Sequence, residues 1–259
     1  MVAASKLRRA QDAATGPKDY TVAARDLLQR LGSSTSVHNH PFFQVRKNEH
    51  TLTILIAGDR GMAGAYNSNT LKALVAHMKS TTAKQSAICV GRHAALQIAN
   101  ASDINEVAAY DMDGRRADFG LAQPILREAV ELFRSGNIDS VQVVYTKFVS
   151  TVRQEVVLEQ ILPVTPPAGL EHKLESELEP EPEILLDFAI MRLLEAQVLQ
   201  AILEARASEQ ASRMLAMMNA TDNAKELITD LTLSFNNARQ AAITQELAEI
   251  SAGAEAIND

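Results

Sequence analysis

Residues 184–257 decide the fold of this chain, and they read ILLDFAIMRLLEAQVLQAILEARASEQASRMLAMMNATDNAKELITDLTLSFNNARQAAITQELAEISAGAEAI. The stretch contains no proline and a single glycine, Gly253. Because an α-helix rises about 1.5 Å per residue, one continuous helix over this stretch would be roughly 110 Å long. Since that is several times the length of an average globular helix, we expect a helix that extends beyond one compact domain.

The second half of this stretch carries a seam of small residues with the spacing of a coiled coil. Its members follow one another at alternating intervals of three and four residues, so a partner helix would approach closely while burying little area per turn. A long helix in an all-α bundle is the alternative, but the middle of the chain has a different pattern. The seam consists of Met217, Ala220, Ala224, Leu227, Leu231, Ser234, Ala238, Ala241, Gln245, Ala248 and Ala252.

Length and composition limit the class of protein. The 259 residues are enough for one or two domains with a sizeable core. Aromatic residues make up only 4% and there is no Trp, which favours helix-rich structure over an all-β fold. The formal net charge of -7 argues against a general nucleic-acid binder, because phosphate binding needs a net basic surface.

The single cysteine, Cys89, lies in the apolar run Ala-Ile-Cys-Val and is predicted to be a buried, inert thiol. No run reaches the ~18 apolar residues that a membrane span needs. The N-terminus lacks the apolar core of a signal peptide. We therefore expect a cytosolic chain, or one that reaches a membrane only through its partners.

Residues 1–31 are predicted to be helical, with an interruption at Gly16-Pro17. This segment is basic, and a solvated helix face explains its charges without any partner. It has an Ala-rich seam of its own, so we expect the two ends of the chain to pair antiparallel. A loop over residues 32–48 follows, with a short element around Phe42 and Phe43. The N-terminal seam consists of Ala3, Leu7, Ala10, Ala14, Thr21, Ala24, Leu28 and Leu31.

Residues 50–164 have the pattern of an α/β domain with a mixed sheet. Unbroken apolar runs indicate strands buried on both faces, and segments with helical spacing separate them. The domain has too few elements for a full dinucleotide-binding fold. The expected strands cover 51–57, 86–90, 107–110, 140–148 and 154–164, and the expected helices cover 71–78, 94–99 and 118–133.

The predicted fold class is thus an α/β domain inserted in a long antiparallel α-helical coiled coil. Residues 1–31 and 184–259 form the coiled coil, and residues 50–164 form the α/β domain. Residues 165–183 are an acidic, proline-rich linker whose glutamates are expected to be solvated, since the composition supplies no fixed geometry for a metal.

The loop after the first strand is glycine-rich like a phosphate-binding loop, but its sequence argues against a ligand site. Residues 58–67 read GDRGMAGAYN, with three glycines between a strand and a helix. The loop lacks the Gly-Lys-Ser/Thr of a P-loop and the spacing of a dinucleotide fingerprint. A tight structural turn is the better interpretation. His38 and His40 have no nearby third ligand and are assigned to a polar loop. The sequence predicts no catalytic, cofactor-binding or metal-binding residues.

Three separated motifs resemble the gamma subunit of F-type ATP synthases. The first is MVAASKLRRAQ at residues 1–11, and the second is DRGMAGAYNSN at 59–69. The strongest is ASEQASRM at 207–214, which continues through NATDNA at 219–224 and ARQAAITQEL at 238–247. Together they extend over essentially the whole chain in the family's order.

The resemblance implies a rotor without an active site of its own. In the family, the coiled coil rises through the hexamer of alpha and beta subunits, and the α/β foot rests on the c-ring together with epsilon. It implies a peripheral location at the cytoplasmic face of the plasma (inner) membrane, with membrane association only through partners, and no cofactor. The matching positions for contact with the acidic catch loop of beta are Arg239, Gln240 and Thr244, with Lys6, Arg8 and Arg9 on the first helix.

The resemblance also implies several helical turns ahead of the position of Met1, which would pair with the far part of the C-terminal helix. Two other hypotheses stay open from the sequence. One is an α/β enzyme that uses the loop at 58–64 on a phosphate ligand. The other is a free-standing coiled-coil adaptor that dimerises without ATP synthase subunits.

Overall fold

The computed structural model describes residues 2–32, 40–101, 103–112, 117–164 and 182–258. It divides the chain into two compact units, Met1–Leu215 and Ala216–Asp259. The linker predicted at 165–183 lies outside the described residues except for its last two positions, where the long helix begins.

The N-terminal segment forms two helices, α1 (Val2–Thr15) and α2 (Lys18–Gly32), which confirms the predicted interruption at Gly16-Pro17. Proline has no N–H to donate to the helix. The helical bonding therefore ends with the Gly16 N–H, which donates to the Asp12 carbonyl, and resumes where the Thr21 N–H donates to the Pro17 carbonyl. The short element expected around Phe42 is the 3-10 helix η1 (Pro41–Phe43).

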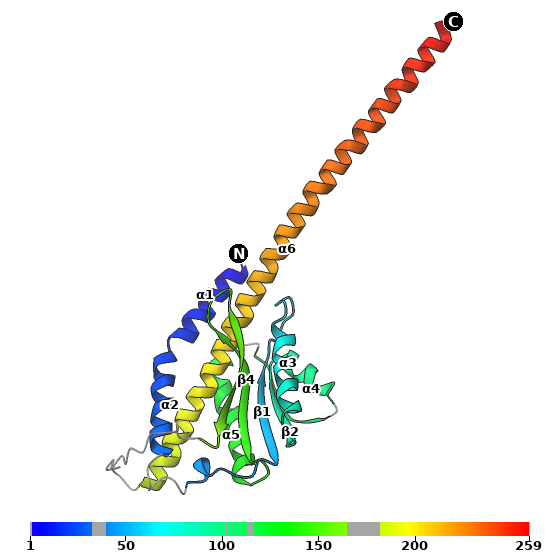
Figure 1. Cartoon of the computed structure of the whole chain (residues 1–259). Coiled ribbons are helices and arrows are strands. Elements are labelled where there is room, and N and C mark those ends of the chain that lie inside the picture. The colour runs from blue at the N-terminus through cyan, green and yellow to red at the C-terminus, as the bar shows by residue number, and fades with distance from the viewer. Residues whose placement is uncertain (1, 33–39, 102, 113–116, 165–181, 259) are drawn as a thin grey trace. The chain divides into compact units, whose positions relative to one another are not determined.

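The α/β domain contains a five-stranded mixed sheet in the order β3-β2-β1-β4-β5 (Figure 1). β1, β2, β3 and β4 run parallel to one another, and β5 is antiparallel to its neighbour β4. The mixed sheet is confirmed, with small differences in strand ends. The strands are β1 (His50–Ile56), β2 (Lys84–Val90), β3 (Ile104–Tyr110), β4 (Ser140–Phe148) and β5 (Gln154–Leu162).

Helices cover both faces of this sheet. α3 (Tyr66–Lys79) and α4 (Arg92–Ala99) lie on one face, where Leu74 and Ile98 pack with Leu55 of β1. α3 begins five residues before the predicted start, because residues 66–70 are mostly polar and hide the apolar period. Cys89 is buried in this layer, and burial followed by the neighbouring Glu106 raises the pKa of its thiol to about 12, as expected of an inert cysteine.

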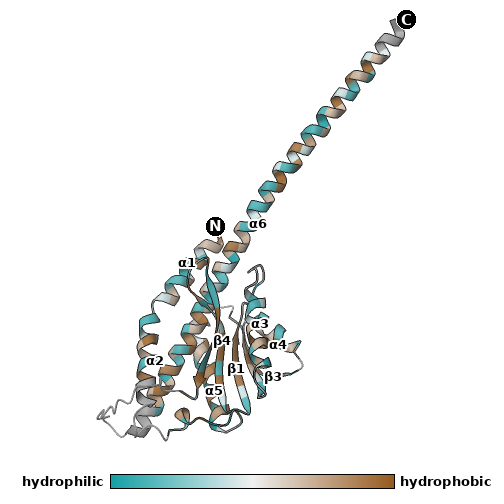
Figure 2. Cartoon of the chain, viewed as in Figure 1, coloured by the Kyte–Doolittle hydropathy of each residue, from teal (hydrophilic) through white to brown (hydrophobic). Residues whose placement is uncertain are grey.

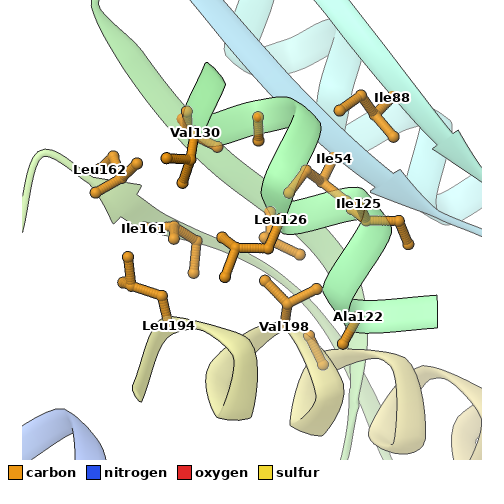
Figure 3. Packing of buried hydrophobic residues seen from close by; sticks show 14 of the residues in the cluster. Ile54, Ile88, Ala122, Ile125, Leu126, Val130, Ile161, Leu162, Leu194 and Val198 are labelled. Carbon is orange, nitrogen blue, oxygen red and sulfur yellow. The ribbon is translucent and has the colours of Figure 1, made fainter. Parts of the chain in front are cut away.

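The opposite face of the sheet holds the main core. α5 (Ala117–Arg134) packs there, and the first part of α6 (Pro182–Asn258) closes the layer. Figure 3 shows Leu126 and Val130 of α5 lying between the strands and Leu194 and Val198 of α6. The long helix is therefore part of the core of the first unit, and its packing there fixes the helix to the sheet.

α1 and α2 pack on α6 and run antiparallel to it within the first unit (Figure 1). Ala14 of α1 contacts Leu203 and Ala207, and the Gln200 side chain donates to the Ala14 carbonyl at 3.0 Å. This carbonyl lies in the last turn of α1, so α6 itself satisfies a group exposed by the break before Pro17.

The seam predicted from Met217 onward is misplaced as the contact surface for the N-terminal helices. The α6 residues that pack with α1 and α2 lie at 190–207, before that seam. In the second unit the described residues from Met217 to Gly253 are exposed, apart from half-buried Asn236. The small-residue period alone did not show where along α6 the partner lies, because apolar and small residues recur over its whole length, as Figure 2 shows.

We predict that Ala14→Leu lowers the free energy of unfolding by about 1–3 kcal/mol, because the added carbons overpack the contact with Leu203 and Ala207. Ala238→Leu, at an exposed position of the second unit, is the matched control and leaves stability unchanged. Urea denaturation of both variants measures the difference. An equal loss in both would mean that the seam is buried within the chain.

Candidate partner contacts and the carboxyl edge of the sheet

The three residues predicted on the C-terminal helix, Arg239, Gln240 and Thr244, lie on α6 in the second unit and are exposed. Gln240 and Thr244 are one helical turn apart and share a face. The Thr244 hydroxyl donates to the Gln240 carbonyl at 2.8 Å, so this hydroxyl is used inside the helix, while the Gln240 amide lies at the surface.

Lys6, Arg8 and Arg9 lie on α1 in the first unit, and all three are exposed. Their neighbour Leu7 is buried and anchors the helix, so the basic side chains project from a fixed backbone. The structure thus brings each predicted set together on its own helix, one set in each unit.

Side chains that accept hydrogen bonds from backbone N–H groups hold the loop at 58–67 in place. The Asn67 carboxamide accepts a hydrogen bond from the Gly58 N–H at 2.9 Å. Asp59 accepts from the N–H of Arg92 at 2.9 Å and from that of Met112 at 3.3 Å. Asp59 therefore ties the end of β1 to the start of α4 and to the chain that leaves β3.

Gly91 sits where two backbones approach most closely. Its φ of +94° and ψ of 145° are accessible to glycine, and a Cβ there would lie 2.1 Å from the Ala57 carbonyl oxygen. The His93 N–H donates to the Gly58 carbonyl at 3.0 Å across the same gap. A hydrogen bond and close backbone packing thus join the segments that follow the adjacent strands β1 and β2.

A stripe of α6 residues one turn apart faces this loop. The Tyr66 hydroxyl donates to the Ala205 carbonyl at 3.0 Å. Glu209 lies against Gly58, whose added Cβ would meet the Glu209 carboxylate at 2.7 Å. The Arg213 guanidinium donates to the carbonyls of Arg60 at 3.0 Å and Gly61 at 3.3 Å.

The two charges of this stripe are buried together. The side chains of Glu209 and Arg213 are only 6% and 10% exposed, and Arg213 Nη2 lies 2.6 Å from Glu209 Oε1. Burial, followed by the charge of Glu209, raises the pKa of Tyr66 above its ordinary value. Tyr66 therefore stays a neutral hydrogen-bond donor toward the Ala205 carbonyl over the physiological range.

This edge is the place where open α/β sheets bind their ligands, in the crevice outside the carboxyl ends of the strands. Here α6 lies against that edge, and the Arg213 guanidinium donates hydrogen bonds to the carbonyls of Arg60 and Gly61. The Arg206 side chain adds a bond to the Met112 carbonyl at 3.3 Å. The edge binds a helix of its own chain, which supports the structural interpretation of the loop.

Glu209 and Arg213 are functional candidates that the sequence analysis missed. They lie inside the ASEQASRM motif, four residues apart on one helix. The signal available was an opposite-charge pair at this spacing in an otherwise small and apolar stretch, flanked by fully buried Ala207 and Ala211. Sequence spacing alone does not distinguish such a pair from a solvated surface ion pair.

A second polar cluster lies at the start of α6. His40 Nε2 lies 2.7 Å from Asp187, and Arg134 forms an ion pair with the same carboxylate at 2.9 Å. Partial burial opposes ionisation of Asp187, but these two partners outweigh it and hold the pKa of the carboxyl below its ordinary value. His40 is thus a tether between η1 and α6, and His38 lies outside the described residues.

The described part of the chain contains neither a metal-binding cluster nor a membrane-spanning helix. No group of three or more His, Cys, Asp or Glu side chains there has the geometry to hold a metal ion. Among the described helices, none has a stretch both long and apolar enough to cross a membrane.

The chain is similar to known proteins along its whole length. A family model described as ATP synthase matches residues 1–257. The ATP synthase gamma chain of Heliobacterium modesticaldum is 38% identical over an alignment of 266 positions, which covers 99% of this chain and 91% of that protein. That of Symbiobacterium thermophilum is 38% identical over 262 residues, with 99% and 90% covered.

Solved structures share the fold at low sequence identity. A chain of the Tetrahymena thermophila mitochondrial ATP synthase central stalk and c-ring has a TM-score of 0.61 and 19% identity, and the match covers 85% of this chain and all of that one. A chain of the Euglena gracilis mitochondrial assembly of OSCP, F1 and c-ring has a TM-score of 0.60 and 19% identity, with 99% and 93% covered.

We predict that Gly91→Ala destabilises the first unit by an amount of order 1–3 kcal/mol from its backbone conformation, with the clash against Ala57 adding to it. Gly120→Ala is the matched control, because a Cβ at Gly120 of α5 meets nothing within 4 Å. The control gains up to about 1 kcal/mol of helix propensity. Thermal and urea unfolding of the two variants measures the expected loss of stability for Gly91→Ala and the expected gain for Gly120→Ala.

We also predict that ATP or a dinucleotide titrated into the purified chain produces no saturable heat, because α6 occupies the carboxyl edge of the sheet. A P-loop ATPase measured under the same conditions controls for sensitivity. Micromolar binding that Gly58→Ala weakens would restore the enzyme hypothesis.

Proposed function

The chain belongs to the ATP synthase gamma chain family and is a central stalk subunit, and we propose that it couples ion-driven rotation of the membrane c-ring to ATP synthesis at the beta subunits. In this proposal the chemistry belongs to the beta subunits, and this chain transmits the rotation of the c-ring to them. The long helix and the sheet are the two parts of the chain that must be held by different neighbours.

One observation carries this proposal: the second unit exposes large apolar side chains along a single helix. Phe235 is 66% exposed and Leu231 is 60% exposed, with Leu227, Ile228 and Leu233 similar. Exposed apolar surface of this extent marks a surface that binds a partner. A ring of alpha and beta subunits around this helix would cover the apolar residues that recur along it (Figure 2).

Each part of the chain has its own place in the proposed rotor. Residues 1–31 and 184–259 are the coiled-coil shaft, 50–164 are the foot, and 165–183 are the linker between them. The shaft would contact the hexamer of alpha and beta subunits, and the foot would contact epsilon and the c-ring. The chain would lie peripherally at the cytoplasmic face of the plasma membrane and reach the membrane through these partners.

We further propose that Arg239, Gln240 and Thr244 contact the acidic catch loop of beta, with Lys6, Arg8 and Arg9 close to the same subunits. A rotor must push on its neighbours without staying bound to one of them, so exchangeable polar contacts suit the task better than large apolar ones. A guanidinium forks onto a carboxylate, and an amide donates to a carbonyl of the same loop. The exposure of all six side chains leaves them accessible for such contacts.

We expect Arg239→Ala combined with Gln240→Ala to lower both ATP synthesis and rotation-linked hydrolysis while the complex still assembles. Single substitutions will have mild effects, because exposed ion pairs are typically worth about 0–1 kcal/mol. The measurement is synthesis and hydrolysis by the complex reconstituted with alpha, beta and epsilon.

The matched control is Lys225→Ala combined with Glu226→Ala, two exposed charged residues of the same helix and unit. This control keeps wild-type rates in both assays. If the Arg239 and Gln240 variant also keeps wild-type rates, these residues carry no torque. If the wild-type chain fails to join alpha and beta at all, the function itself is refuted.

A further inference from the structure

We propose that Glu209 and Arg213 are positioning residues that lock α6 against rotation relative to the sheet, so that torque passes between them without slip. The inference rests on the proposed function, since only a rotor loads this contact with torque. The polar lock, as we call it, consists of Glu209 and Arg213 of α6 with the backbone of residues 58–61, and all of it lies within the first unit.

The apolar packing of α6 fixes the helix against the sheet, and directional hydrogen bonds add resistance to rotation about the helix axis. Between Ile190 and Ile202 the helix meets α5 and the strands through aliphatic side chains (Figure 3). Hydrophobic contact is non-directional and depends on the area removed from water. A small rotation of the helix disturbs close packing that side chains can partly restore by shifting, whereas hydrogen bonds weaken steeply as their angle departs from linearity.

Asp187 pairs with Arg134 at the start of α6, and a further group of directional contacts with the domain around the sheet lies on the turns that follow Ile202. The lock binds the loop after β1, and Tyr66 binds the Ala205 carbonyl. Arg206 reaches the Met112 carbonyl beyond β3, and the Ser212 hydroxyl donates to Gln154 at the start of β5 at 3.2 Å. The contacts thus hold α6 from both ends of the strand order, an arrangement that opposes rotation about the helix axis in either sense.

Arg213 is the member with the greatest leverage. Its long side chain places the guanidinium away from the helix axis, and the planar group donates to the Arg60 and Gly61 carbonyls and to the Glu209 carboxylate. A planar fork of this kind fixes orientation as well as distance, which a single ammonium does not. Glu209 in turn holds the guanidinium on the side of Gly58, where the missing side chain makes room for the carboxylate.

Stability alone is a poor explanation for this pair. Charges buried in a protein lose their hydration, and replacing a buried ion pair by neutral side chains of similar size is often harmless to stability. Orientation is what an apolar pair at these positions would not supply. Mutations that remove both charges can therefore separate a role in stability from a role in orienting α6.

The test uses three variants of the lock in the whole membrane-bound complex. Arg213→Met removes the fork and leaves the Glu209 carboxylate buried without its partner. Arg213→Met combined with Glu209→Gln removes that uncompensated charge, so stability recovers while the carbonyls of Arg60 and Gly61 still lack their donor. Arg213→Lys keeps a positive charge beside Glu209 but offers one ammonium in place of the fork.

Inverted membrane vesicles are made from cells in which each variant replaces the gamma chain of the complex. ATP hydrolysis and the ATP-driven membrane potential, read with an oxonol dye, are measured together, and the dye reports pumping whichever cation is moved. The ratio of potential to hydrolysis is expected to fall severalfold in the Met single variant and in the double variant. The Lys variant is expected to lie between these and the wild type.

Ile98→Ala is the control for general destabilisation, because Ile98 is buried on the α4 face of the sheet, away from α6. It lowers the melting temperature of the purified chain but keeps the wild-type ratio. A double variant that regains both stability and the wild-type ratio overturns the lock, and so does an Ile98→Ala variant that uncouples equally. If the wild-type chain supports no ATP-driven potential, the proposed function fails instead.

Discussion

The first part of α6 packs between the α5 face of the sheet and the N-terminal helices, and the attachment of those helices to the sheet depends on this contact. Val198 and Ile202 belong to the same core as the strands, while Leu203 and Ala207 meet α1. A helix of 77 residues has far more surface than one domain covers. Burying its first part therefore fixes the helix to the sheet and leaves residues 216–258 as a unit with exposed apolar side chains for partners.

The carboxyl edge of the sheet is used in this chain for a contact with its own long helix. Parallel strands bring their carboxyl ends together, and loops there offer backbone groups that other proteins of this architecture turn toward ligands. In this chain Asp59 and Gly91 hold the loops close together, and Arg213 donates to the carbonyls of Arg60 and Gly61. Fold and function are thus connected through a site that binds a helix of the same chain.

Much of the architecture was predictable from local patterns. The apolar runs identified all five strands, and proline chemistry located the break between α1 and α2. The start of α3 was not predictable, because Tyr66 and Thr70 are buried for tertiary reasons that leave no apolar period. For the same reason Glu209 and Arg213 escaped notice: only the loop folded against them makes their charges different from those of a surface pair.

The sequence by itself determined the mixed sheet and the long helix, because periodicity and turn chemistry act over a few residues and survive without tertiary contacts. The family was indicated by the resemblance of three motifs, at residues 1–11, 59–69 and 207–247. Tertiary structure decided which stretch of α6 is buried. Small and apolar residues recur at helical spacing both before and after Met217, so both stretches satisfy the same local rule. Only the surfaces of α1, α2 and α5, assembled from distant parts of the chain, select residues 190–207 for burial and leave the later seam exposed.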